Sequence, residues 1–235
     1  AFMDEELQGH MNLTSANSIN VARFLPQAFY YFNAYAQAKK LGKADNLTIC
    51  VPSGNFGNIT AGLFAQRMGL PIMNFIAANN ANDIFYNYLL SGIYSPKASI
   101  QTIANAMDVG DPSNFARILD LYKSSHAEIC NHISGATYSD DEIAATMKKC
   151  YEQTGYVLDP HGACGYQALK DNLKEGETGV FLETAHPAKF KEKVDAILST
   201  DIEIPTRLAD FMKGKKQSLE MAADFSAFKQ FLLSV

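Results

Sequence analysis

The sequence predicts an α/β fold of three layers, in which a mostly parallel sheet is flanked by helices on both faces. Short apolar runs alternate with stretches of helical periodicity, which is the pattern of parallel sheets covered by helices. Two of these runs, LTICV and GVFLET, are mostly apolar, as strands buried on both faces are. With 235 residues, 47% hydrophobic and 19% charged, the chain can bury a sizeable core and is not disordered.

The first long helix is expected over residues 18–42. Pro26 lacks the N–H that the helical ladder needs, so it either kinks this helix or sits in its first turn. Gly42 is a suitable C-terminal stop. One stripe at helical spacing is formed by Val21, Leu25, Ala28, Phe29, Phe32 and Ala36.

Two strand–helix units are expected next. Residues 47–51 form a buried strand, residues 53–58 a turn, and residues 59–69 a helix that ends at Gly69. A second strand over 71–78 and a helix over 82–92 follow in the same way.

Residues 94–138 are less regular. A long surface loop is expected up to residue 114, with Asp111 and Pro112 as the cap and first turn of a helix over 115–125.

The last third is again well patterned. Ser139 can cap a helix over 139–155, with Glu142 three residues further on and Gly155 as its stop. The other expected elements are a helix over 159–173, a strand over 179–184, a helix over 185–198 and one or two terminal helices after Pro205. We expect residues 1–235 to form one large-domain portion without a linker.

Charge and composition exclude several classes of protein. The net charge is −5, from 20 Lys and Arg against 25 Asp and Glu, and no basic cluster supports nucleic-acid binding. No apolar run approaches the roughly 20 residues that span a bilayer. The acidic start AFMDEELQGH does not resemble a signal peptide, and the four cysteines are scattered. We therefore expect a cytoplasmic protein with reduced thiols.

The turn SGNFGN, residues 53–58, is the strongest candidate for a binding site. It follows a strand and precedes a helix, where parallel α/β sheets bind ligands. Gly54 and Gly57 allow unusual backbone torsions and close approach, so successive N–H groups could converge on a phosphate beside the positive end of the helix. Ser53, Asn55 and Asn58 add polar side chains without negative charge. The alternative is a tight turn without a ligand.

Five segments, in this order, closely resemble threonine synthase, a pyridoxal-phosphate enzyme of the tryptophan-synthase-β-like fold (fold type II). They are NSINVARFLPQ (17–27), VPSGNFGNITAGLFAQRMGLPI (51–72), NAMDVGDPSN (105–114), DPHGACGYQAL (159–169) and TAHPAKFKE (184–192). The resemblance implies the large domain of that fold, incomplete in this chain. It also implies conversion of O-phospho-L-homoserine and water into L-threonine and phosphate.

The resemblance also implies which residues hold pyridoxal 5′-phosphate. The loop with Ser53 at its start cradles the cofactor's phosphate, and Thr184 faces the pyridine nitrogen. A neutral hydroxyl at that nitrogen would not favour its protonation, as a carboxylate would. Alternatively, Thr184 is a helix cap. The loop residues that match the family are Gly54, Asn55, Phe56, Gly57 and Asn58.

Four polar residues before the first helix are candidates for the substrate region: Asn17, Ser18, Asn20 and Arg23. Arg23 could pair with the substrate's phosphate, because guanidinium binds phosphate through two hydrogen bonds. The alternatives are capping and a solvated Arg.

The histidines carry weaker hypotheses. His161 and His186 stand beside prolines at expected helix starts, where capping is favoured over acid–base catalysis. The spacing of His126, Cys130 and His132 is unspecific, so we expect no metal site.

The Schiff-base lysine of the family, and its substrate-carboxylate loop, have no counterpart here; in the family both lie upstream of all five segments. We therefore expect a C-terminal part of a longer enzyme that is inactive alone and self-associates through exposed apolar surface. The alternatives are another fold type II enzyme, such as a serine or threonine dehydratase, and a non-catalytic module that binds phosphate or pyridoxal phosphate.

Overall fold

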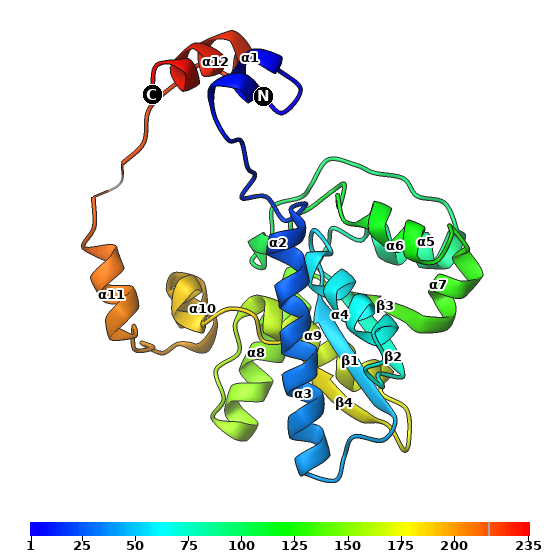
Figure 1. The fold of residues 1–235 in the computed structure, drawn as a ribbon. Helices are drawn as coiled ribbons and strands as arrows, with labels where there is room; N and C mark the ends of the chain where they lie inside the picture. The colour runs from blue at the N-terminus through cyan, green and yellow to red at the C-terminus, as the bar shows by residue number, and fades with distance from the viewer. Residues whose placement is uncertain (216) are drawn as a thin grey trace. The chain divides into compact units, whose positions relative to one another are not determined.

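Figure 1 shows a computed structural model of the chain, which describes residues 1–215 and 217–235. The described residues form two compact units. The larger consists of residues 18–203 and the smaller of residues 1–17 and 204–235. The expectation that residues 1–235 form one domain portion stays a prediction.

A four-stranded parallel sheet is the middle layer of the larger unit. Its strands are β1 (Leu47–Pro52), β2 (Asn74–Asn79), β3 (Ile133–Thr137) and β4 (Thr178–Phe181), in the order β3-β2-β1-β4. Cys50 of β1 stands opposite Ile76 of β2 and Phe181 of β4. All of β1 is buried, as its apolar run predicts, whereas β4 is an edge strand and only half-buried.

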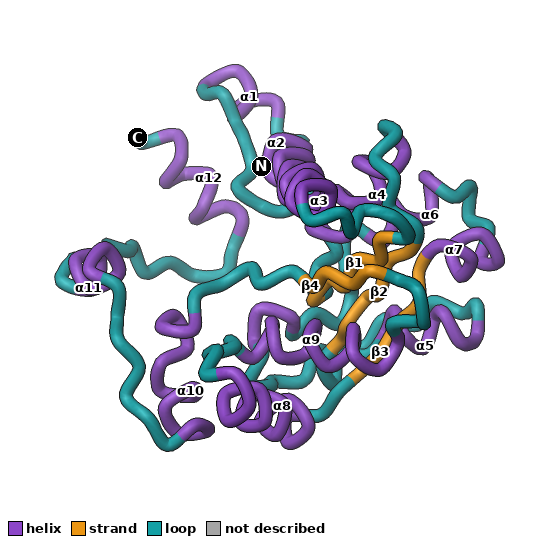
Figure 2. Tube along the Cα trace, turned by 90° about the horizontal axis from the view of Figure 1, so that it is seen from below, coloured by secondary structure: helices purple, strands orange, loops and turns teal. Residues whose placement is uncertain are grey.

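Successive residues of β1 point to opposite faces of the sheet and enter two separate cores. Ile49 and Val51 belong to one apolar cluster, and Cys50 to the other. Figure 2 shows helices α3 (Ala28–Lys40) and α4 (Gly57–Arg67) on one side of the sheet. Helices α8 (Asp140–Thr154) and α9 (Pro160–Asn172) lie on the other. The three predicted layers are confirmed.

The helix predicted over 18–42 is divided near Pro26. Helix α2 (Val21–Phe24) continues through a 3₁₀ segment (Leu25–Gln27) into α3. The buried side chains are Phe24, Ala28, Tyr31 and Ala38, whereas Phe29 of the predicted stripe is 71% exposed. Apolar residues surround this helix on several sides, so their spacing alone does not identify the face that is buried.

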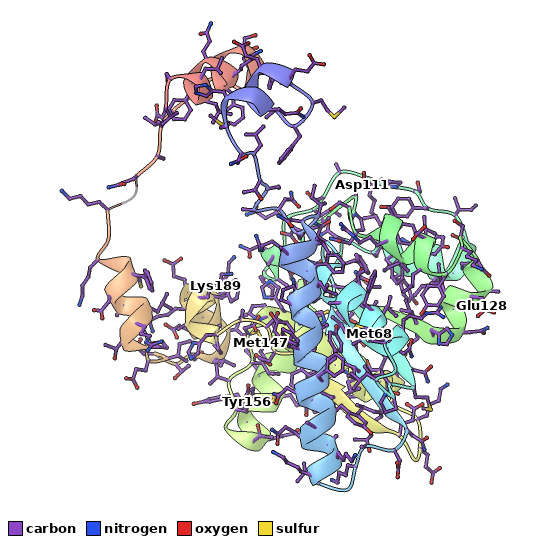
Figure 3. The ribbon with its side chains drawn as sticks, in the orientation of Figure 1. Met68, Asp111, Glu128, Met147, Tyr156 and Lys189 are labelled. Atoms are coloured by element: carbon purple, nitrogen blue, oxygen red, sulfur yellow. The ribbon has the colours of Figure 1, made fainter. Side chains whose placement is uncertain are left out.

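In the middle region one predicted cap is wrong, and two elements were not predicted. Helix α6 (Phe115–Leu121) begins at Phe115, so Asp111, which is labelled in Figure 3, does not cap it. The Asp111 carboxylate instead accepts a hydrogen bond from Tyr94 Oη at 2.7 Å. Sequence analysis also missed α7 (His126–His132) and β3. The segment ISGAT of β3 is short and contains Gly and Ser, which gives it little strand character.

The caps around α8 and α9 are confirmed. Ser139 and Glu142 form a capping box at α8, and Gly155 ends it with φ +71°. Asp159 caps α9, as its side chain accepts a hydrogen bond from His161 N. The remaining elements of this unit are α5 (Ile84–Ser91), 3₁₀ turns at Asn105–Met107 and Pro187–Phe190, and α10 (Lys191–Leu198).

The smaller unit contains α1 (Glu5–His10), α11 (Thr206–Met212) and α12 (Phe225–Leu233). Within it, Lys229 Nζ pairs with Asp4 at 2.9 Å and with Glu6 at 2.8 Å. The helices predicted after Pro205 are thus present. Among the helices of the described residues, none has the length and apolar character needed to cross a bilayer.

Candidate cofactor site

A cleft of about 290 Å³ lies at the carboxyl edge of the sheet. From β1 the chain proceeds to β2 and β3 on one side, and it returns to β4 on the other side of β1. Parallel sheets bind ligands at such a reversal of strand order, outside the strand ends. The cleft is lined by Ser18, Gln27, Tyr30, Pro52, Gly54, Asn55, Phe56, Gly57, Asn58, Ala106, Met107, His161 and Thr184.

Ser53 fixes the start of the loop and does not line the cleft. Its N–H donates to Ala78 O at 2.8 Å, and its hydroxyl donates to Val51 O at 2.8 Å. The Asn79 side chain donates to Ser53 O at 3.0 Å. The loop therefore leaves the sheet in one fixed direction.

Gly54 and Phe56 determine how the loop turns. A Cβ on Gly54 would lie 2.8 Å from both Ala106 O and Met107 Cα, so only glycine fits there. Phe56 adopts a left-handed conformation with φ +63° and buries its ring, 4.7 Å from that of Phe85. Helix α4 begins immediately afterwards, at Gly57.

The asparagine side chains of the loop hold its backbone. Asn55 Oδ1 accepts hydrogen bonds from Ser113 N at 2.7 Å and Ser113 Oγ at 2.9 Å, and its amide donates to Ser18 Oγ. Asn58 Nδ2 donates to Pro52 O at 2.8 Å, and Asn58 Oδ1 accepts from Ile59 N at 2.9 Å. These side chains are thus occupied within the protein.

The backbone N–H groups of the loop are available to bind a ligand. In the part of the chain that the structure describes, the amides of Gly54, Asn55 and Phe56 have no hydrogen-bond acceptor. The first amides of α4 also lack intrahelical acceptors, and the helix dipole makes this end positive. No carboxylate stands among the lining residues. The cleft therefore suits an anion such as a phosphate ester.

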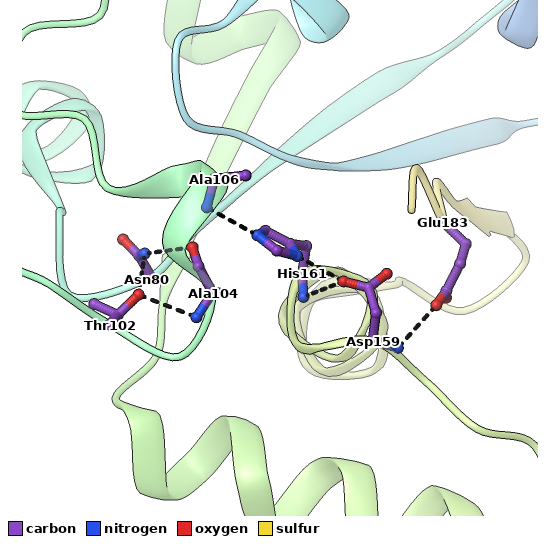
Figure 4. A network of polar contacts seen from close by, with 7 residues as sticks. All are labelled: Asn80, Thr102, Ala104, Ala106, Asp159, His161 and Glu183. Atoms are coloured by element: carbon purple, nitrogen blue, oxygen red, sulfur yellow. Dashed lines mark hydrogen bonds and ion pairs between the residues drawn. The ribbon is translucent and has the colours of Figure 1, made fainter. Parts of the chain in front are cut away.

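Another part of the lining comes from the start of α9 and the turn at Asn105–Met107 (Figure 4). His161 Nδ1 lies 2.6 Å from Asp159 Oδ1, and Ala106 N donates to His161 Nε2 at 3.1 Å. Because Nε2 accepts, the ring is neutral with its hydrogen on Nδ1. The turn is itself held by Asn80, whose amide donates to Ala104 O at 3.3 Å.

Glu183 stands next to Thr184 and contacts Asp159. Its Oε1 accepts a hydrogen bond from Asp159 N at 3.1 Å (Figure 4). Burial raises the pKa of Glu183 to about 8; the Asp159 N–H bond opposes this rise, while the charge of Asp159 adds to it.

The family whose model is described as pyridoxal-phosphate dependent enzyme matches residues 6–184, most of the chain. The chain belongs to this family of pyridoxal-phosphate-dependent enzymes. A second model, described as threonine synthase, C-terminal, matches residues 162–232.

Known relatives agree with this membership. Threonine synthase from Haemophilus influenzae is 48% identical over 233 residues, which cover 99% of this chain and 54% of that protein. The crystal structure of threonine synthase from Escherichia coli superposes with a TM-score of 0.90 at 43% identity, covering 100% of this chain and 54% of that one. An X-ray structure of pyridoxal-phosphate-bound threonine synthase from Brucella melitensis superposes with a TM-score of 0.87 at 34% identity, covering 99% of this chain and 55% of that one. The chain spans about half the length of these relatives.

The fold type II architecture predicted from sequence is thereby confirmed, and the residues of the cleft fit the cofactor of the family. A loop that admits no Cβ at Gly54, unpaired amides and a neutral lining suit a phosphate group. Thr184 is exposed and lines the same cleft.

The structure brings most of the predicted site residues together, and their roles stay predictions. Six of the seven predicted cofactor-binding residues line the cleft, and the seventh, Ser53, is buried and does not line it. Of the substrate candidates, Ser18 lines the cleft, while Asn20 caps α2 by accepting from Ala22 N at 2.9 Å. Arg23 is exposed on α2, outside the described lining. Asn17 belongs to the smaller unit.

Six other residues line the cleft: Gln27, Tyr30, Pro52, Ala106, Met107 and His161. Sequence reasoning gave none of them a cofactor or substrate role, and at His161 it favoured capping over acid–base catalysis. All of these residues except Tyr30 lie in segments that carry the resemblance, which was the available signal. His186 caps the Pro187–Phe190 turn by accepting from Ala188 N at 3.1 Å, as its position indicated. His126 Nε2 lies 3.3 Å from Cys130 Sγ, and His132 packs against Tyr122.

Proposed function

We propose that this chain is the cofactor-holding part of a threonine synthase, which converts O-phospho-L-homoserine and water into L-threonine and phosphate. The observation that carries the proposal is the loop at residues 54–58, which lines a cleft together with Thr184 and whose first amides have no acceptor among the described residues. The similarity to threonine synthases over nearly the whole chain supports this substrate over those of other fold type II enzymes.

In this proposal each side of the cleft has one task. The amides at residues 54–58 bind the cofactor's phosphate, with α4 adding its positive end. Thr184 offers a neutral hydroxyl to the ring nitrogen, so the protein does not stabilise a proton there. When bound, pyridoxal phosphate withdraws electrons from the substrate and so allows protons to leave its carbon atoms.

The proposal also includes a cytoplasmic location and self-association. All four cysteines are free, which suits reduced thiols in a cytoplasmic enzyme. Exposed apolar side chains on α3 support self-association of this chain, which is tested below.

A chimeric protein tests the reaction. The portion of the Haemophilus influenzae enzyme that this chain does not match is joined to residues 1–235. Given O-phospho-L-homoserine and pyridoxal phosphate, it should release phosphate and form threonine in equal amounts. The 235-residue chain alone should bind pyridoxal phosphate, in competition with inorganic phosphate, without turnover.

Three outcomes would contradict the proposal. Formation of an oxo acid from serine or threonine, without phosphate release from O-phospho-L-homoserine, would indicate a dehydratase. Cofactor binding by the chimera without any reaction would indicate a non-catalytic module. Substantial turnover by the 235-residue chain alone would show that this chain is more than a cofactor-holding part.

A further inference from the structure

Asp159 and Glu183 each bury a carboxyl oxygen that the protein leaves without a donor. Asp159 Oδ2 and Glu183 Oε2 have no hydrogen-bond partner in the described part of the chain. The other two oxygens are occupied: Asp159 Oδ1 by the N–H and Nδ1 of His161, and Glu183 Oε1 by Asp159 N. Two buried acceptor atoms are therefore in need of a hydrogen.

One proton shared between the two carboxyl groups would satisfy both oxygens. Asp159 N contacts Glu183 Oε1 at 3.1 Å, and the side chain of Asp159 raises the pKa of Glu183. Two ionised carboxylates have no hydrogen to place between them. Asp159 has the His161 N–H groups to stabilise its charge, whereas no Lys, Arg or His of the described residues pairs with Glu183. The proton therefore belongs on Glu183, and Asp159 is the acceptor.

The carboxyl pair connects parts of the cleft that are distant in sequence. Glu183 precedes Thr184 in the segment after β4, and Asp159 and His161 begin α9. A Cβ on Gly162 would lie 2.3 Å from Glu183 Oε2, so this carboxyl group is packed directly against the first turn of α9. His161 reaches Ala106, whose carbonyl abuts Gly54.

We propose that Glu183 carries the proton of a carboxyl pair shared with Asp159, and that it thereby acts as a positioning residue for Thr184. The role at Thr184 rests on the proposed function, while the shared proton does not.

The direction of the pH dependence follows from the raised pKa of Glu183. The folded protein holds this proton more tightly than the unfolded chain, whose Glu has a pKa near 4.5. The contribution to stability is therefore complete below about pH 4.5, and it is lost as the pH rises toward about 8. The titratable groups that face Glu183 or share its surroundings are Asp159, His161, Tyr156, His186 and Glu203.

The first experiment locates the proton in the cofactor-free protein. The Cδ carbons of glutamate are labelled with ¹³C, and the Glu183 signal is identified by its absence in Glu183→Gln. We expect this signal to titrate well above the other glutamates. In Asp159→Asn, whose amide can donate to Glu183, its midpoint should fall toward the ordinary range.

The second experiment measures positioning through the affinity for pyridoxal 5′-phosphate. As the pH rises from 7 to 9, affinity should fall by about tenfold, the scale of one lost hydrogen bond to a charged group. Glu183→Gln, whose amide supplies the same donor at every pH, should bind as tightly as the parent at pH 7 and lack that fall. This variant also controls for titration of the cofactor itself.

If the Glu183 carboxyl group titrates with the midpoint of an ordinary glutamate, the proposal of a shared proton is overturned. An unchanged pH dependence of affinity in Glu183→Gln would overturn the positioning role. Neither result would bear on whether the chimera makes threonine, so failure here is distinct from failure of the proposed function.

Discussion

Gly54 has room for a hydrogen atom but not for a methyl group. In Gly54→Ala the new Cβ would meet backbone atoms of Ala106 and Met107 at 2.8 Å, and backbone cannot rotate away as a side chain does. We expect a loss of about 1–3 kcal/mol in the free energy of unfolding. Affinity for pyridoxal phosphate should fall as well, because the loop amides would shift.

Gly57→Ala is the matched comparison for folding. A Cβ there would meet its nearest neighbours at 3.7 Å, which is ordinary contact, so stability should be close to that of the parent. Thermal unfolding of the cofactor-free proteins measures both changes. Equal destabilisation by the two substitutions would show that the contact with the turn is not the reason.

The sequence identified the loop but not the segment of the chain that contacts it. Two glycines three residues apart between a strand and a helix indicated close approach of a ligand. The partner of Gly54 is instead another backbone segment, some 50 residues away in sequence, and no local pattern reports such a contact. The contact of Glu183 with Asp159 was hidden for the same reason.

At the scale of elements, α8 offers a test of local structure apart from the cleft. Ser139→Ala removes the hydroxyl of the capping box and should cost about 0.5–2 kcal/mol of stability, as measured by urea unfolding. Ser139→Thr keeps the hydroxyl and should retain most of that stability. Neither change should alter affinity for pyridoxal phosphate, since Ser139 lies outside the lining; a loss of affinity would contradict this.

The elements that were predicted correctly carry local signals in their own sequence. The capping box of α8, the Asp-Pro start of α9 and the apolar run of β1 are local features, and the structure has all three. In contrast, β3 is stabilised by pairing with β2 and by packing, and its own residues carry little preference for a strand.

At the scale of the whole molecule, three aromatic side chains of α3 are exposed. Phe29, Tyr30 and Phe32 are 71%, 48% and 37% exposed. We expect concentration-dependent self-association in sedimentation experiments, and Phe29→Glu should weaken it by placing charge in the contact.

Leu41→Glu is the control for this prediction. Leu41 is 73% exposed just beyond the end of α3, so the variant adds the same charge away from the three aromatic residues. Equal effects of the two variants would show that net charge, and not these aromatic residues, governs association.

Phe56 combines a backbone conformation that favours glycine with a side chain that the interior requires. Glycine at this position would relax the main chain but leave a void beside Phe85, and any other apolar residue would keep the strain while filling the space differently. We therefore expect very few substitutions to be tolerated at this position. If the loop binds an anion as proposed, Phe56 serves both the shape of the binding loop and the filling of the interior.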